Sequence, residues 1–266
     1  MKRLILSILL ILSVTARAGR PVFRAASTPA FSIGAPTAVL PTGHVANDIL
    51  FLIVETSNQT IAAPTGYTQL TNSPQGTGTG AAVDSVALQI FWKRDGGSES
   101  APTIPDSGDH TGVSMFAYSN CVTTGTPFFT PNGGVIASVQ TNPSFTTSAN
   151  VRSRSGLAVT FIANGSDTTT TMTTATMTAT GNAKLSAQAG RQVINNATGT
   201  GGGWTERDAA YSSPDTTGAY TYSATYAISA KYAGLAFVLI PVSHRIEVSS
   251  WWQLIFDRMI AALNLP

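Results

Sequence analysis

The chain has 266 residues, of which 43% are hydrophobic and only 11% are charged, and its net charge is +2. This balance excludes a disordered chain, and the length allows one large domain or two small ones. Basic residues gather at the two ends, so the body between them is mildly acidic and has no basic stripe. Nucleic-acid binding is therefore disfavoured, whereas such low charge suits secreted proteins and subunits of large assemblies.

Residues 1–18 have the pattern of a secretory signal peptide. Lys2 and Arg3 precede a short apolar stretch, and a small-x-small cleavage pattern ends at Ala18. The stretch is too short for a comfortable transmembrane helix. We expect either cleavage during export or an apolar N-terminal arm that a partner buries. Residues 19–38 then form an N-terminal extension.

One pattern occurs twice between residues 39 and 242. Each copy has an apolar strand, a Gly-aromatic-Thr corner, an alternating strand and a second apolar strand. The first strand of each copy is almost continuously apolar, which is typical of a strand covered on both faces. We therefore predict an all-β, jelly-roll-like β-sandwich built from two pseudo-repeated halves, about 39–130 and 143–242. The matched segments are 49–54 with 157–163, 66–68 with 203–205, 86–92 with 220–228, and 112–118 with 233–240.

The second half carries additional residues, among them a Thr-rich stretch at 168–180. Because Thr is β-branched, this stretch predicts an exposed strand or hairpin rather than disorder. The aromatic residues Tyr67, Trp204 and Tyr211 lie near predicted loops and have two interpretations. They close the ends of the core, or they form a platform that binds a sugar.

After residue 242 the alternating pattern stops and a helical period begins. Ser250 and Gln253 fit a capping box, and the apolar stripe that follows predicts a short C-terminal amphipathic helix in the tail 243–266. The helix packs on its own sandwich, docks a neighbouring subunit, or lies in a membrane interface. Because its polar face has a single Arg, we favour a protein contact over a membrane contact. The predicted partner-binding residues are Trp251, Trp252, Ile255, Phe256, Met259, Ile260 and Leu263.

Few residues offer catalytic chemistry. The three histidines, His44, His110 and His244, are widely scattered, and no Gly-x-Ser-x-Gly elbow is present. A Ser-His-Asp arrangement around His110, with Asp106 or Asp109, rests on loose spacing alone. We therefore expect a protein that is not an enzyme and that needs no cofactor.

Asp106 and Asp109 are the candidate metal ligands. Two carboxylates in a loop can hold Ca²⁺ together with backbone carbonyls, but calcium loops usually supply more carboxylates than this. We therefore favour an Asx turn between two strands and expect no metal. Glu206 and Asp208 are likewise interpreted as acids of surface turns. The single cysteine, Cys121, ends an apolar run, which predicts a buried and inert thiol.

Short motifs of the first half resemble those of tailed-phage and prophage virion proteins. In that group, a Gly-Asp-x-Leu strand precedes Pro-x-Gly-Trp-Thr and a strand that ends in Trp-Lys. Here Asn47 replaces the Gly of the first motif, Tyr67 replaces the Trp of the second, and Trp92-Lys93 ends the third. The second half repeats part of the pattern at 203–205. The resemblance implies a non-enzymatic β-sandwich with a capsid-decoration, tail or fibre role.

The sequence therefore favours a structural subunit of a virion or surface assembly. Such a subunit packs against copies of itself or against a shell or tail protein. It is expected in the virion, or outside the cell if residues 1–18 are cleaved. The alternative is a secreted bacterial carbohydrate-binding or adhesion module, with a glycan as its ligand.

Overall fold

The computed structural model describes most of the chain between residues 19 and 242. Within the described residues the chain forms fourteen β-strands and no helix, and Arg20–Val242 is one compact unit. The predicted signal peptide and the predicted C-terminal helix lie outside the described residues. The described residues are 19–57, 59–76, 85–147, 153–166, 173, 175–196, 202–214, 218–227 and 229–242.

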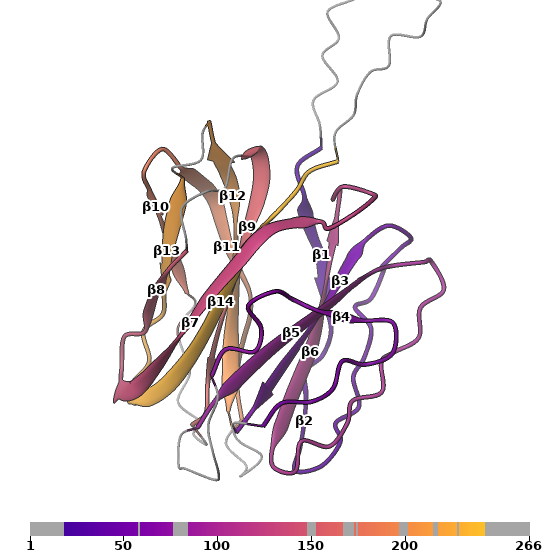
Figure 1. Ribbon diagram of the computed structural model, residues 1–266, viewed down its shortest axis with the longest axis vertical. Coiled ribbons are helices and arrows are strands. Elements are labelled where there is room, and N and C mark those ends of the chain that lie inside the picture. Colours follow the sequence, from indigo (N-terminus) through magenta and orange to yellow (C-terminus); the bar gives the residue numbers. More distant parts are fainter. Residues whose placement is uncertain are drawn as a thin grey trace, which may run out of the picture. The chain divides into compact units, whose positions relative to one another are not determined.

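The first half of the chain forms one antiparallel sheet (Figure 1). Residues 19–38, which the sequence sets apart as an extension, contribute two strands that both pair with β6. The strands lie in the order β1 (Val22–Ala26), β6 (Thr111–Ser119), β3 (Ile49–Thr56), β5 (Ala87–Arg94) and β4 (Thr68–Gln69), with β2 (Ala30–Ser32) beside β6.

The second half forms two antiparallel sheets. The five-stranded second sheet has the order β11 (Lys184–Asn195), β12 (Gly203–Ser213), β9 (Ser153–Asn164), β14 (Ala230–Leu239) and β7 (Phe128–Gln140). The three-stranded third sheet has the order β10 (Thr176–Thr180), β13 (Ala219–Ser223) and β8 (Ser144–Thr146). The strand β10 confirms the prediction that the Thr-rich stretch contains an exposed strand.

Five strands of the six-stranded first sheet and the five strands of the second sheet repeat one order, and β2 stands outside the repeat. The first strand of each half lies at an edge, next to the last strand, and the middle position is taken by β3 in one sheet and β9 in the other. From edge to edge, β1-β6-β3-β5-β4 therefore corresponds to β7-β14-β9-β12-β11. In the second half, β7, β8, β9 and β10 lie alternately in the second and third sheets, and β13 returns to the third sheet.

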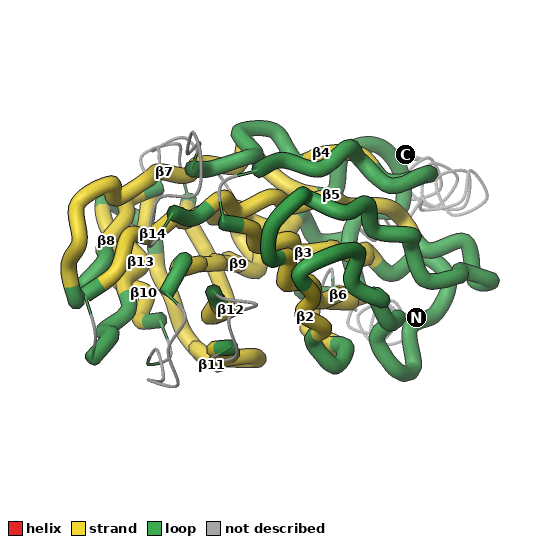
Figure 2. Tube along the Cα trace, turned by 90° about the horizontal axis from the view of Figure 1, so that it is seen from below, coloured by secondary structure: helices red, strands yellow, loops and turns green. Residues whose placement is uncertain are grey.

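The three sheets are stacked, with the second sheet between the first and the third (Figure 2). One apolar cluster joins the first and second sheets, and another joins the second and third sheets. A third cluster lies on the outer face of the first sheet, where loop residues such as Ile61 and Ile104 cover Leu50 and Leu52. The predicted β-sandwich is confirmed, with an additional layer on each side.

The layer between the first two sheets is built from aromatic rings. The ring of Phe51 in β3 lies 4.7 Å from that of Phe237 in β14, and the ring of Phe116 lies 5.2 Å from that of Phe161. All eight residues of β3 are buried. Its alternate side chains enter the inter-sheet layer on one face and the loop-covered layer on the other. This confirms that the continuous apolar run marks a strand covered on both faces.

The two Gly-aromatic-Thr corners are not equivalent, although the sequence pairs them. Tyr67 precedes β4, whereas Trp204 lies in β12, which takes the sheet position of β5. The predicted match between 86–92 and 220–228 is also wrong, because the run that begins at Tyr220 forms β13 of the third sheet. Three-residue similarity could not reveal this, since local pattern does not specify which neighbour a strand pairs with.

The substitution Phe51→Ala tests the inter-sheet layer. It removes a fully buried ring that contacts rings from β6, β7 and β14. We expect the free energy of unfolding to fall by about 3–5 kcal/mol. The control Val39→Ala, at a side chain that is 48% exposed, should change it by less than about 0.5 kcal/mol. Urea denaturation measures both, and equal effects would contradict this account of the core.

Candidate functional site

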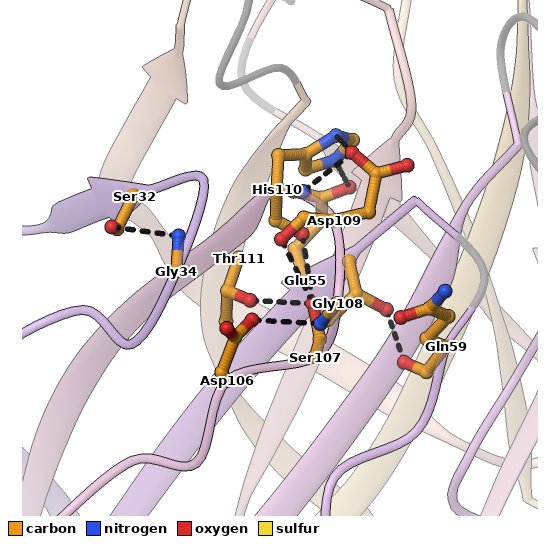
Figure 3. A network of polar contacts seen from close by, with 11 residues as sticks. Ser32, Gly34, Glu55, Gln59, Asp106, Ser107, Gly108, Asp109, His110 and Thr111 are labelled. Carbon is orange, nitrogen blue, oxygen red and sulfur yellow. Dashed lines mark hydrogen bonds and ion pairs between the residues drawn. The ribbon is translucent and has the colours of Figure 1, made fainter.

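The polar turn 106–111 joins β5 to β6 (Figure 3). Asp106 Oδ1 accepts a hydrogen bond from the backbone N–H of Gly108 at 2.7 Å, which closes an Asx turn. Asp109 Oδ1 accepts a hydrogen bond from the backbone N–H of His110, also at 2.7 Å. Both candidate metal ligands thus hold backbone groups of their own turn. Among the described residues, no group of three His, Cys, Asp or Glu side chains is placed to hold a metal ion.

The hydroxyl of Ser107 is also used within this turn. Its Oγ donates to the carbonyl oxygens of Asp109 and His110 and lies 2.7 Å from Thr111 Oγ1. His110 Nε2 lies 3.2 Å from Glu55 Oε1, and both side chains are buried. The histidine is thus held against a carboxylate of β3, an association that the sequence did not predict.

A glycine of the second half closes over this His-Glu pair. A Cβ atom at Gly202 would lie 2.2 Å from Glu55 Oε2, so a side chain there is excluded. Its φ of 81° also favours glycine. The Glu55 carboxylate therefore lies against Gly202 of the second half, at the end of β3.

The phage-like motifs of the first half meet at the opposite end of β3. Asp48 Oδ1 accepts a hydrogen bond from Arg24 at 3.1 Å, and its other oxygen accepts from the backbone N–H of Val45. The backbone N–H of Asp95 donates a hydrogen bond to the carbonyl oxygen of Asp48 at 2.8 Å. His44 Nδ1 lies 2.5 Å from the carboxylate of Asp95. These contacts show that the motif aspartate closes a corner of the sheet.

Two departures from the motif have structural explanations. Asn47 has a φ of 72°, a left-handed conformation that Gly adopts freely and Asn tolerates better than most residues. Tyr67 is buried, and Lys93 Nζ lies over its ring at 5.3 Å while pairing with Glu99. Burial raises the pKa of the Tyr67 hydroxyl. The Gly-Tyr-Thr and Trp-Lys motifs are therefore two sides of one packed corner.

The proposed aromatic sugar platform does not form. Tyr67 is 8% exposed, and Trp204 and Tyr211 are fully buried. The Trp204 ring stacks on Phe31 at 5.3 Å, and its Nε1 donates to Gln192 Oε1 at 2.8 Å. These three aromatics close the core, which was the other interpretation of the sequence.

Glu206 and Asp208 lie on β12, so their interpretation as acids of surface turns is wrong. Both side chains are almost fully buried. Glu206 accepts hydrogen bonds from the Tyr118 hydroxyl at 2.8 Å and from the backbone N–H of Arg191 at 3.2 Å. The Arg191 guanidinium donates to both oxygens of Asp208 and lies over the ring of Phe23 at 4.7 Å. Glu206, Asp208 and Tyr118 are buried, and the partly exposed Arg191 covers them from β11. Together we call these four residues the buried polar cluster.

Burial governs the ionisation of this buried polar cluster. Loss of hydration raises the pKa of Glu206 well above its ordinary value, and the neighbouring charge of Asp208 raises it further. Burial also raises the pKa of Asp208, against the opposing effect of Arg191. The sequence does contain a signal for the burial of these two carboxylates. Alternate residues of a strand share one face, so Glu206 and Asp208 lie on the same face as the core residue Trp204.

Cys121 is buried, as the sequence predicts. Burial raises the pKa of its thiol to about 12, so the reactive thiolate is disfavoured at neutral pH. Its backbone forms an isolated bridge with Pro241, which joins the ends of the two halves. The thiol is therefore part of the packing.

The predicted partner-binding residues and His244 lie outside the described residues. Among the described residues, no helix is long and apolar enough to cross a membrane. The partner-binding residues concerned are Trp251, Trp252, Ile255, Phe256, Met259, Ile260 and Leu263.

Comparisons of the chain with protein-family models, with curated proteins and with solved structures gave no match.

The substitution Glu206→Gln tests the ionisation of the buried polar cluster. The folded-state pKa of Glu206 is raised above its unfolded value, so its contribution to stability is full at low pH and is lost as pH rises through the raised pKa. We expect the wild-type free energy of unfolding to fall across that window. In the Glu206→Gln variant, the free energy of unfolding should fall less across the same pH range. Urea denaturation at a series of pH values measures the difference.

Glu99→Gln is the matched control, with the opposite sign. The hydrogen bond from Lys93 and that from the backbone of Gly96 lower the pKa of Glu99. Its contribution is present above the ordinary pKa and is lost as pH falls through the lowered value. The Glu99→Gln variant should therefore be less stable than the wild type at neutral pH and as stable as the wild type in acid. If both substitutions gave the same profile, the folded protein would stabilise the charged form of Glu206, contrary to our account.

Proposed function

We propose that this protein is a non-enzymatic structural subunit of a virion or surface assembly that acts through protein–protein packing. The observation that carries the proposal is that four carboxylates of the described residues each accept hydrogen bonds from other groups of the same chain. The carboxylates of Asp106 and Asp109 hold a turn, and Glu206 and Asp208 join strands inside the sandwich. Groups spent on internal contacts support a scaffold rather than a catalyst.

We also propose a jelly-roll topology for each half of the chain. Strands that alternate between two stacked sheets are characteristic of a jelly roll. The second half alternates from β7 to β11 and again from β12 to β14, while β11 and β12 are neighbours in the second sheet. The first half retains the corresponding five-stranded sheet, and loops take the place of its outer sheet. A bridge between Thr37 and Thr103 occupies the position of the β8–β13 pairing. We infer two jelly-roll units in tandem, an architecture used in capsids and in lectins.

Three edge strands, β7, β8 and β10, are poor sites for strand addition. Gln188 bonds both the N–H and the carbonyl of Met177 in β10 through its side-chain amide. Asn132 donates to the carbonyl of Thr146 in β8, and Asn72 donates to that of Pro131 in β7. Side-chain amides thus occupy backbone groups that a neighbouring chain would need. Assembly is then left to surfaces and to the chain ends.

We therefore assign the assembly contact to the C-terminal tail 243–266. Its bulky apolar stripe includes Trp252, Phe256, Met259 and Leu263. Burial of each such side chain is worth roughly 1.5–3 kcal/mol, and aromatic and Met residues are enriched at interface cores. This supports docking on a second copy or on a shell or tail protein.

The second candidate function is a secreted bacterial carbohydrate-binding or adhesion module. The signal-like pattern of residues 1–18 favours it, because tailed-phage virions assemble inside the cell. Mass spectrometry of the native N-terminus separates the two proposals. A mature chain that begins at Gly19 supports export, and a retained Met1 supports a virion subunit assembled in the cytoplasm.

Deletion of residues 249–266 should leave a folded sandwich that no longer assembles. We expect light scattering to show a larger species for the full-length protein and a monomer for the truncated one. The truncated protein should still unfold cooperatively, at a temperature no higher than that of the full-length protein, because assembly stabilises the folded subunit. The substitution Phe256→Ser, within the apolar stripe, should weaken assembly, whereas Asn264→Ser on the other side should leave it unchanged. Full assembly of the truncated protein, or liposome binding without self-association, would refute this assignment.

A further inference from the structure

The two ends of the described chain leave the sandwich beside one turn. Val22, at the start of β1, pairs with Ser119 at the end of β6. The backbone N–H of Val242 donates a hydrogen bond to the carbonyl oxygen of Asn120 at 2.9 Å. Paired residues lie roughly 5 Å apart, and consecutive Cα atoms lie about 3.8 Å apart. Val22, the N-terminal exit, is therefore within roughly 15 Å of Val242, the C-terminal exit. The indigo and yellow ends of the ribbon accordingly lie side by side in Figure 1.

The sandwich holds both exits in place. On the N-terminal side, Arg24 of β1 donates a hydrogen bond to the buried carboxylate of Asp48 at 3.1 Å. On the C-terminal side, Pro241 forms a backbone bridge with the buried Cys121. The distance between the two exits is therefore fixed by the fold.

The segments beyond the two exits carry apolar runs of matching length. Residues 4–14 are apolar except for Ser7 and Ser13, and the predicted stripe of the C-terminal tail spans 252–263. As helices, both runs are about 15–17 Å long. The first run ends eight positions before the N-terminal exit, and the second begins ten positions after the C-terminal exit.

The direction of the chain makes the two runs antiparallel. The chain approaches the sandwich through residues 4–14 and leaves it through 252–263. Because the two spacers are of similar length, the runs reach a similar distance from the sandwich. Eight extended residues span about 26 Å, so the spacers easily bridge the separation of the exits.

Proximity selects the N-terminal run as the cover of the C-terminal stripe. Both runs are too apolar to remain in water. Two segments that short flexible linkers hold near each other have an effective concentration in the millimolar range. A separate partner protein must exceed that concentration to displace the contact at equal affinity. Residues 4–14 are also apolar on every side, so they can cover the stripe and still present an apolar surface.

We propose that residues 4–14 pack antiparallel against the apolar stripe of the C-terminal tail within one chain, and that the two runs together form the docking element of the subunit. The inference rests on the proposed function, because it names what completes the assembly contact. One side of the N-terminal run covers the stripe, and its other side faces the neighbouring subunit. Residues 1–18 are then retained in the mature protein.

Cysteine cross-linking of the full-length protein tests the pairing. Ser7 and Met259 lie fifteen and seventeen positions from their exits, so Ser7→Cys with Met259→Cys should form a disulfide within one chain. Ser7→Cys with Ser250→Cys is the matched control, because Ser250 lies only eight positions from its exit. In a glutathione redox buffer, we expect the first pair to close several-fold faster than the control. Burial raises the pKa of the Cys121 thiol to about 12, so the native cysteine does not compete.

Non-reducing electrophoresis and mass spectrometry measure the cross-links. Equal rates for the two pairs, or disulfides formed only between chains, would overturn the proposal. Circular dichroism establishes that each variant retains the folded sandwich.

Deletion of residues 2–18 provides a second readout. Light scattering should show the same loss of assembly as deletion of 249–266. Full assembly without residues 2–18 would overturn the proposal, as would a native chain that begins at Gly19. Assembly that survives deletion of 249–266 would refute the proposed assembly contact instead, and the cross-linking rates would still decide whether the two runs pair.

Discussion

The whole structure depends on the apolar layer between β3 and β9, the central strands of the first and second sheets. Both strands are buried on both faces, so each sheet must be covered twice. The shared layer, with Phe51 against Phe237 and Phe116 against Phe161, covers one face of each sheet. Loops cover the other face of the first sheet, and the third sheet covers that of the second. The layered fold follows from this single requirement.

Low charge shapes the way in which polar groups are satisfied. With only 11% charged residues, the chain uses amides and hydroxyls where other proteins use ion pairs. The amide of Gln89 bonds both the N–H and the carbonyl of Ile61, as Gln188 does for Met177. Such bonds close loops and edges without the dehydration of a charge. The three strands of the third sheet contain no charged residue at all.

Two buried carboxylates, Glu206 and Asp208, lie where the halves meet, whereas Asp48 and Asp95 are buried at a corner of the first sheet. Glu206, Asp208 and Arg191 of the second half contact Tyr118 and Phe23 of the first. A cluster of this kind gains little net stability, because dehydration of the charges offsets their attraction. It does require particular partners, so it favours one alignment of the two sheets over others. The Glu55–His110 pair beneath Gly202 adds a second such constraint at the end of β3.

The sequence alone determined the strands whose apolar runs are continuous, the repeat of the two central strands, the buried state of Cys121, and the Asx turn at Asp106. These follow from local periodicity and turn chemistry, which need no knowledge of distant residues. Only the tertiary structure decided that Trp204 lies in β12, that Tyr220 belongs to a third sheet, and that Glu206 is buried. Strand pairing is a non-local choice between neighbours with similar patterns, and an alternating polar residue marks a surface only when nothing covers that face.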